Sequence, residues 1–132
     1  EFADRYPGDK FVDIVGFDIY QNAGQANEDF SKTLTSRLKI LLEFANSKKK
    51  VAAITELGYE QIPAAEWWTK TFYPSVEGLP VSYALFWRNA ANRPNHYYMP
   101  YPGQISENDF RKLYDLKETF FLRDLEKIHI YK

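Results

Sequence analysis

Residues 11–20 read Phe-Val-Asp-Ile-Val-Gly-Phe-Asp-Ile-Tyr, a mostly apolar run that ends in an aromatic residue with a hydroxyl group. Two further runs, Val51 to Glu56 and Val81 to Trp87, also end in polar or aromatic side chains. Continuous apolar runs rich in Val, Ile and Ala are typical of parallel strands that are buried on both faces. In barrels of such strands the catalytic groups lie at the C-terminal strand ends, so the pattern indicates an active site.

The segments between these runs predict helices. Asn27 is a candidate N-cap with two acidic residues after it, and apolar residues then recur at three- and four-residue steps as far as Ala45. A second helix is expected around residues 67–72, and Pro74 should end or kink it. Each connection exceeds the roughly dozen residues that a parallel crossover requires. The order therefore predicts a βαβαβ unit with right-handed crossovers.

A long loop is expected after the third run. Residues 89–104 are rich in Asn, Pro and Tyr and have no apolar period. Loops of this length in compact domains are usually functional, and this one leaves the same strand end as Trp87, so we expect it to wall the cleft. Ser106 and Asp109 then resemble a weakened capping box, and residues 110–117 are expected to form a helix.

Length and composition limit the class of protein. A complete eight-stranded barrel needs roughly 250 residues, whereas this chain has 132 and begins without Met, a basic segment or an apolar leader. The hydrophobic share of 45% and the charged share of 27% are close to those of packed domains. We therefore expect residues 1–132 to be a single partial catalytic domain of the α/β class, the C-terminal portion of a barrel.

The charge pattern argues against several partners. With a net charge of −1 and dispersed basic residues, the chain has no electrostatic footprint for nucleic acid or an anionic membrane surface. No apolar stretch approaches the roughly 20 residues needed to cross a bilayer. The chain has no cysteine, and no carboxylate cluster in the sequence frames His96, interpreted as an exposed loop residue, or His129. We expect neither a metal nor another cofactor.

The aromatic share, 17%, indicates the type of ligand. Sugar rings present apolar C–H faces that pack on flat aromatic surfaces, while their hydroxyls need polar partners at the rim. Trp87 is a candidate floor under a sugar ring, although a Trp at a strand end is also common in cores. Asn89, which adjoins Arg88, is a candidate further contact to the sugar.

Glu56 is the strongest catalytic candidate. It closes a mostly apolar strand, so its carboxylate should emerge at the barrel mouth. There it can attack an anomeric carbon if neighbours hold it ionised and oriented, as in retaining glycosidases. Tyr20 and Arg88, at the ends of flanking strands, can donate hydrogen bonds to it. The alternative is that Glu56 only forms an ion pair with Arg88.

Asp18 should face the cleft together with Tyr20, because alternate strand residues point to the same side. Gly16, on the same face, leaves room for close packing. Asp13 lies at the start of the strand, where a polar residue is associated with stability rather than with catalysis.

Three spaced motifs are recognisable: Tyr6 to Asp9 leading into Val12 to Tyr20, then Ile54-Thr55-Glu56-Leu57-Gly58, then Ala84 to Ala90. Over nearly the whole chain they resemble glycoside hydrolase family 26, the β-mannanases. The resemblance implies strands six to eight of a (β/α)8 TIM barrel, and a secreted, periplasmic or cell-surface location.

The resemblance also implies roles for individual residues. By it Glu56 is the nucleophile, Tyr20 the tyrosine that hydrogen-bonds it, and Trp87 the aromatic platform near the cleavage subsite. Asp18 and Arg88 match substrate-binding positions. The family's acid/base glutamate lies on the fourth strand, in a His-Glu motif that has no counterpart here. Because retaining hydrolysis needs two carboxylates roughly 5 to 5.5 Å apart, we predict that the isolated chain is inactive.

The expected function is therefore that of a fragment of a retaining endo-β-1,4-mannanase. Its partners would be a mannan-type polysaccharide and the missing N-terminal part of the barrel. Xylan and mixed-linkage glucan are alternative substrates within the family. A rival from another class is a non-catalytic carbohydrate-binding fragment. An open doubly wound nucleotide binder ranks last, because no strand is followed by a glycine-rich turn.

Overall fold

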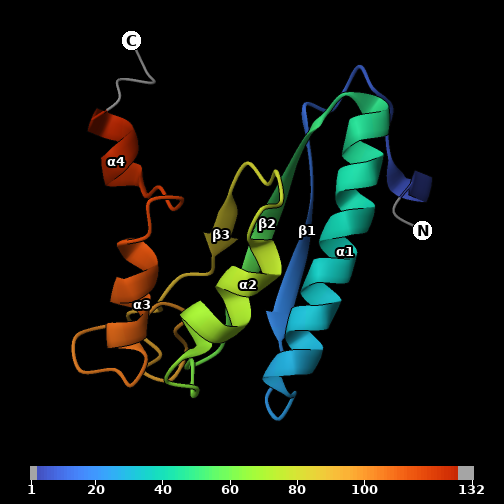
Figure 1. Ribbon diagram of the computed structural model, residues 1–132. Helices are drawn as coiled ribbons and strands as arrows, with labels where there is room; N and C mark the ends of the chain where they lie inside the picture. Colours follow the sequence, from blue (N-terminus) through green and yellow to red (C-terminus); the bar gives the residue numbers. More distant parts are fainter. Residues whose placement is uncertain (1–2, 128–132) are drawn as a thin grey trace.

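The structure is a computed structural model that describes residues 3–127 (Figure 1); the second histidine, His129, lies outside this range. Its strands form one sheet in the order β1-β2-β3, and both neighbouring pairs are parallel. The predicted α/β class and parallel sheet are thus confirmed. The elements are η1 (Ala3–Arg5), β1 (Ile14–Gln21), α1 (Asn27–Lys48), β2 (Val51–Tyr59), η2 (Trp68–Phe72), α2 (Tyr73–Val76), β3 (Ala84–Phe86), α3 (Glu107–Tyr114) and α4 (Leu122–Lys127).

Helix α1 covers one face of the sheet beside β1 and β2, while α3 and α4 lie beyond β3 (Figure 1). The predicted apolar stripe is its packing surface. Because each fully buried apolar side chain contributes about 1.5–3 kcal/mol, this stripe is a main source of stability for the unit. Its buried members are Phe30, Leu34, Leu38, Leu41 and Ala45.

The start of α1 differs from the expected one. Ala26 occupies the N-cap position, and no side chain caps the helix. Asn27 is instead the first helical residue, and its Oδ1 accepts a hydrogen bond from Gln21 Nε2 at 2.8 Å. Gln21 Oε1, the oxygen of the same side-chain amide, accepts a hydrogen bond from the buried Trp67 indole N–H at 2.6 Å. Asn27 therefore ties the end of β1 to α1 instead of capping the helix.

The strand lengths also differ from the expected ones. β2 continues past Glu56 to Tyr59, and β3 is only three residues long. Three backbone hydrogen bonds extend the pairing with β2 beyond Ala84–Phe86: Ser82 N–H to the Ala52 carbonyl (2.9 Å), Ile54 N–H to the Tyr83 carbonyl (2.9 Å) and Trp87 N–H to the Leu57 carbonyl (3.0 Å). The third run is thus extended as predicted, but an irregularity in β2 between Ile54 and Leu57 limits the regular ladder.

The second helix forms where it is expected and responds to Pro74 in an unexpected way. A π-helical turn, η2, comes directly before α2, and Tyr73 N–H donates to the Trp68 carbonyl five residues back. The helix then continues through Pro74 and ends at Val76. A proline inside a helix clashes with the carbonyl four residues back, and here the turn next to Pro74 is widened.

The predicted capping box at the start of α3 is wrong. Ser106 is at the N-cap position but donates to Gln104 Oε1 at 2.7 Å and accepts from the Trp68 indole at 3.0 Å. Asp109 is 3% exposed and accepts from the backbone N–H of Thr69 (3.0 Å) and from its hydroxyl (2.6 Å). Both polar side chains therefore hold α3 against η2. The helix ends at Tyr114 rather than at residue 117.

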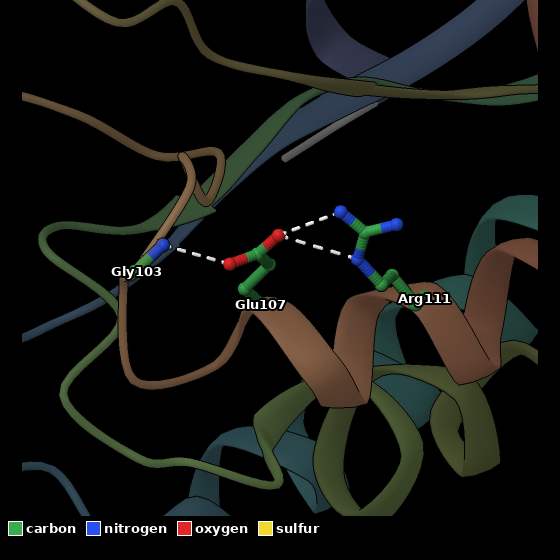
Figure 2. A network of polar contacts seen from close by, with 3 residues as sticks. All are labelled: Gly103, Glu107 and Arg111. Atoms are coloured by element: carbon green, nitrogen blue, oxygen red, sulfur yellow. Dashed lines mark hydrogen bonds and ion pairs between the residues drawn. The ribbon is translucent and has the colours of Figure 1, made fainter.

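A small polar network fixes the end of the long loop to the first turn of α3 (Figure 2). Gly103 N–H donates to Glu107 Oε2 at 2.7 Å, and Arg111 donates to Glu107 Oε1 from Nε (3.2 Å) and Nη2 (2.7 Å). The Gly103 hydrogen bond, followed by those from Arg111, lowers the pKa of Glu107 below its ordinary value. Gly103 has a φ of +88°, a conformation that favours glycine.

Candidate active site

A β-bulge in β2 positions the candidate nucleophile. Phe17 pairs with Ile54, whereas the next residue, Asp18, pairs with Glu56, so β2 contains one extra residue at this point. Ile54 and Leu57 are both fully buried in the core beneath the sheet, although they are three residues apart. The two residues between them, Thr55 and Glu56, are thereby both directed to the face opposite the core.

Two side-chain hydrogen bonds join β1 and β2 on this face. The Tyr20 hydroxyl donates to Glu56 Oε2 at 2.9 Å, and the Thr55 hydroxyl donates to Asp18 Oδ1 at 2.7 Å. The expected pairing of Tyr20 with Glu56 is therefore present. Burial, and then the bond to Glu56, raise the pKa of Tyr20 far above its usual range. Tyr20 thus remains a neutral donor to the carboxylate at any physiological pH.

Gly16 lets the two strands approach closely at this site. A Cβ atom at position 16 would lie 2.5 Å from Thr55 Cγ2 and 2.9 Å from the Ala53 carbonyl oxygen. Contacts this short do not occur without displacement of the backbone. The prediction that Gly16 leaves room for close packing is confirmed, and the residue it accommodates is the threonine that holds Asp18.

Tyr98, from the long loop, packs behind Tyr20. The two rings meet edge to face with their centroids 5.5 Å apart, and Tyr98 is 9% exposed. His96 packs edge-on against the other side of Tyr98, at 5.3 Å, and its Nδ1 lies 2.7 Å from Glu60 Oε1. His96 is thus half-buried and paired with a carboxylate, contrary to its interpretation as an exposed residue. Sequence reasoning missed this pair because Glu60 lies in a different loop.

The residues that follow β3 are arranged differently. Trp87 is half-buried and Arg88 is exposed, and within residues 3–127 no hydrogen bond or ion pair joins Arg88 to Glu56. Asn89 clamps the long loop: its Oδ1 accepts from the backbone N–H groups of Tyr98 (3.0 Å) and Met99 (2.9 Å). Its Nδ2 donates to the Met99 carbonyl at 2.9 Å. Neither the expected restraint of Glu56 by Arg88 nor the alternative ion pair is formed.

A hollow of about 400 Å³ adjoins Tyr20 and Tyr98 between the loops that follow β1 and β2. A larger, mostly apolar groove of about 760 Å³ lies between β3, α2 and the segment before α4. It contains none of the predicted site residues, so its size does not make it the active site. The hollow of about 400 Å³ adjoins the tyrosine bonded to Glu56, and another hollow, of about 330 Å³, adjoins Tyr20 together with Asp18. The hollow beside Tyr98 is lined by Tyr20, Gln21, Asn22, Ala23, Gly24, Tyr59, Glu60, Gln61, Pro63 and Tyr98.

Two negative findings apply to residues 3–127. No group of three or more His, Asp or Glu side chains in this range is arranged to hold a metal ion. No helix in the same range combines the length and apolar character needed to span a membrane.

Comparison with known proteins defines the class to which the chain is assigned, the glycoside hydrolases. Residues 1–77, more than half of the chain, match the sequence profile of Glycosyl hydrolase family 26. The chain belongs to this family, as the three motifs predict.

Individual relatives lead to the same assignment. The chain is similar to the solved GH26 β-mannanase BoMan26A from Bacteroides ovatus, with 43% identity, a TM-score of 0.86, and coverage of 92% of this chain and 34% of that chain. A Cellulomonas fimi endo-β-1,4-mannanase double mutant shows 32% identity and a TM-score of 0.76, over 88% of this chain and 27% of that chain. A mannan endo-1,4-beta-mannosidase from Bifidobacterium adolescentis is 25% identical over 87% of this chain and 13% of that protein. The chain thus spans about a third or less of each relative.

Proposed function

We propose that residues 1–132 are the C-terminal part of the catalytic domain of a retaining endo-β-1,4-mannanase. In this proposal β1, β2 and β3 are strands six, seven and eight of a (β/α)8 barrel, and Glu56 is the nucleophile. The observation that carries it is the 2.9 Å hydrogen bond from Tyr20 to Glu56, at the C-terminal ends of adjacent parallel strands. Family membership and the β-mannanase relatives support the substrate class.

The geometry suits a nucleophile. Tyr20 occupies Glu56 Oε2, whereas Oε1 accepts no hydrogen bond from the described residues and is available to attack an anomeric carbon. A neutral donor fixes the orientation of the carboxylate without protonating it, as covalent catalysis requires. Trp87 would stack under the sugar ring. Asp18, whose Oδ1 is held by Thr55, and Arg88 would contact sugar hydroxyls.

Asn89 remains a proposed sugar contact with a restricted role. Its carbonyl oxygen and one amide hydrogen are used to fix residues 98–99, so any direct contact with substrate would come from the remaining amide hydrogen. Its larger contribution would be to the shape of the loop.

The second carboxylate must come from outside this chain. Asp18 pairs with Glu56 in register, but its Oδ1 accepts from the Thr55 hydroxyl and we assign it to sugar binding, not to the acid/base role. The face of the sheet opposite α1 also exposes Ile14, Val51 and Leu85, which are 46%, 48% and 45% exposed. We infer that the N-terminal part of the barrel covers this face and supplies the acid/base, and that the isolated chain is inactive.

Replacing Glu56 in the full-length parent tests the proposal. Glu56→Gln keeps the size and one hydrogen-bond acceptor for Tyr20 but removes the nucleophile, so mannan hydrolysis should fall by several orders of magnitude. Glu66→Gln is the matched control, because Glu66 is an exposed carboxylate before η2. The parent that carries this change should hydrolyse mannan at the normal rate. Near-normal turnover by Glu56→Gln would instead support the non-catalytic carbohydrate-binding rival.

The polysaccharide is decided by a second measurement. Substrates of the family differ mainly in one hydroxyl or its orientation, which a site reads through hydrogen bonds. The parent is expected to hydrolyse mannan in preference to xylan and mixed-linkage glucan, and a preference for either of the latter would replace the substrate assignment. Since polymeric mannan does not cross membranes, we also place the parent outside the cytoplasm, which cell fractionation checks.

A further inference from the structure

We propose that Tyr98 is a positioning residue for catalysis: its ring is the wall that keeps the Tyr20 hydroxyl on Glu56. The inference rests on the proposed function of Glu56 and extends it to the long loop after β3. Tyr98 acts through Tyr20, whose ring it meets edge to face at 5.5 Å.

Gly58 makes room for this wall. A Cβ atom at position 58 would lie 2.4 Å from Tyr98 Cδ1 and 3.1 Å from Tyr98 Cγ. The backbone of Gly58 is not in the left-handed region, so glycine is not required there by conformation. The absent side chain therefore serves the fit of the Tyr98 ring over β2, two residues after Glu56. That contact places the ring against Tyr20.

The loop that carries Tyr98 is anchored on both sides of the ring. Asn89 Oδ1 accepts from Tyr98 N–H at 3.0 Å, and the His96 ring, which packs on Tyr98, lies 2.7 Å from Glu60 through its Nδ1. The Tyr97 carbonyl accepts from Gln61 N–H at 2.8 Å. His96 and Tyr97 are thus bonded to the segment that follows β2, and Tyr98 is bonded to Asn89.

The segment after β2 is itself held in an unusual conformation. Gln61 and Ile62 have φ values of 63° and 42°, which are rare for residues with a side chain and especially for a β-branched one. The Gln104 side-chain amide donates to the carbonyls of both residues at 3.0 Å. Tyr97 and Gln104, from two parts of the long loop, therefore both form hydrogen bonds to the turn at residues 61–62. This fixed frame gives the Tyr98 ring a defined position behind Tyr20.

Removing the Tyr98 ring should lower the rate of the chemical step more than it weakens substrate binding. Tyr98 is the one aromatic ring in contact with Tyr20 among residues 3–127. Without it the Tyr20 ring gains freedom, the hydroxyl leaves Glu56 for part of the time, and the carboxylate loses its orientation. A small misplacement of a reacting group costs up to about 100-fold in rate.

The test uses the full-length parent and the variants Tyr98→Ala and Tyr98→Phe. Tyr98→Ala should lower kcat about tenfold or more with little change in KM. Tyr98→Phe keeps the ring and should retain most of the wild-type kcat. The decisive measurement is Tyr98→Ala in a Tyr20→Phe background, where there is no hydroxyl left to position. There Tyr98→Ala should have almost no further effect on kcat.

Gly58→Ala approaches the same contact from the opposite side. Its added methyl displaces the Tyr98 ring and should lower kcat in the same manner, whereas in a Tyr98→Ala background the methyl has space and should cost nothing more. This pair keeps the inference testable if Tyr98→Ala folds poorly, which thermal unfolding reports. Equal loss from Tyr98→Ala with and without the Tyr20 hydroxyl, or an undiminished effect of Gly58→Ala without the Tyr98 ring, overturns the inference. Either result leaves the role of Glu56 intact, since only normal turnover by Glu56→Gln removes that.

Discussion

The ends of β2 and β3 differ in how completely this chain orders them. At the end of β2, Glu56 receives a hydrogen bond from Tyr20, and the ring of Tyr20 packs on Tyr98. At the end of β3, Arg88 is exposed and forms no bond to Glu56. The orientation of the proposed nucleophile is thus built into adjacent strands, whereas the side chain of Arg88, a proposed sugar contact after β3, takes no part in orienting it.

The largest expected effect comes from breaking the ordered end. Tyr20→Phe in the parent removes one hydroxyl and leaves the ring against Tyr98. We expect kcat to fall about 100-fold, because the carboxylate of Glu56 loses the donor that orients it. Steady-state kinetics on mannan measure this. An unchanged kcat would mean that the end of β2 is no better prepared for catalysis than the end of β3.

A change at the open end should have a different kinetic signature. Trp87→Ala removes the proposed platform and should raise KM roughly tenfold, equivalent to about 1.4 kcal/mol of binding free energy, with a smaller effect on kcat. Trp87→Phe keeps a flat ring, so its KM should lie between those of the wild type and Trp87→Ala. A fall in kcat as large as that of Tyr20→Phe, with KM unaltered, would contradict the division between the two strand ends.

The packing beneath β3 gives a stability prediction. Asp109→Ala leaves the Thr69 N–H and hydroxyl without their buried partner, which should reduce the free energy of unfolding by about 1–3 kcal/mol. Asp109→Asn retains an acceptor and should cost less. Denaturant unfolding of both variants measures the difference. Because Asp109 bonds to Thr69 and not to Tyr20 or Glu56, kcat of the folded Asp109→Ala protein should be close to that of the wild type.

The smallest expected effect concerns the pH dependence of the exposed Glu107 network (Figure 2). Because folding lowers the pKa of Glu107 from its ordinary value of 4.5, its contribution to stability is present at neutral pH. It is lost as the pH falls through that value and below. Glu107→Gln should therefore be slightly less stable than the wild type at pH 7 and equal to it in acid. A difference that grows on acidification would reverse the sign and contradict the assignment.

Much of the fold follows from local patterns in the sequence. The apolar stripe from Phe30 to Ala45 predicted α1 because a helix repeats on a fixed period, whatever the rest of the chain does. The pairing of Tyr20 with Glu56 followed from parallel strands ending at the same edge. The side chains of Asn27, Ser106 and Asp109 were assigned to helix caps, and in the structure each bonds to a residue in another element.

The elements that sequence reasoning missed depend on contacts between distant segments. The bulge in β2 is defined only by its pairing with β1, and a single strand read alone predicts strict alternation. Tyr98 reaches Tyr20 only because a loop folds back over Gly58. One signal was available: Gly58 lies two residues after Glu56 in the same strand, and glycine in a strand often marks the close approach of another group.

The bulge in β2 lies between two core residues and involves the polar residues that bond to β1. Ile54 and Leu57 both pack in the interior, so the extra residue at positions 55–56 places two polar side chains on the opposite face while both apolar neighbours stay in the core. Shortening the strand by one position there would restore perfect pleating and erase the juxtaposition of acid and phenol. One extra residue in β2 thus lets two neighbouring side chains, Thr55 and Glu56, both bond to β1.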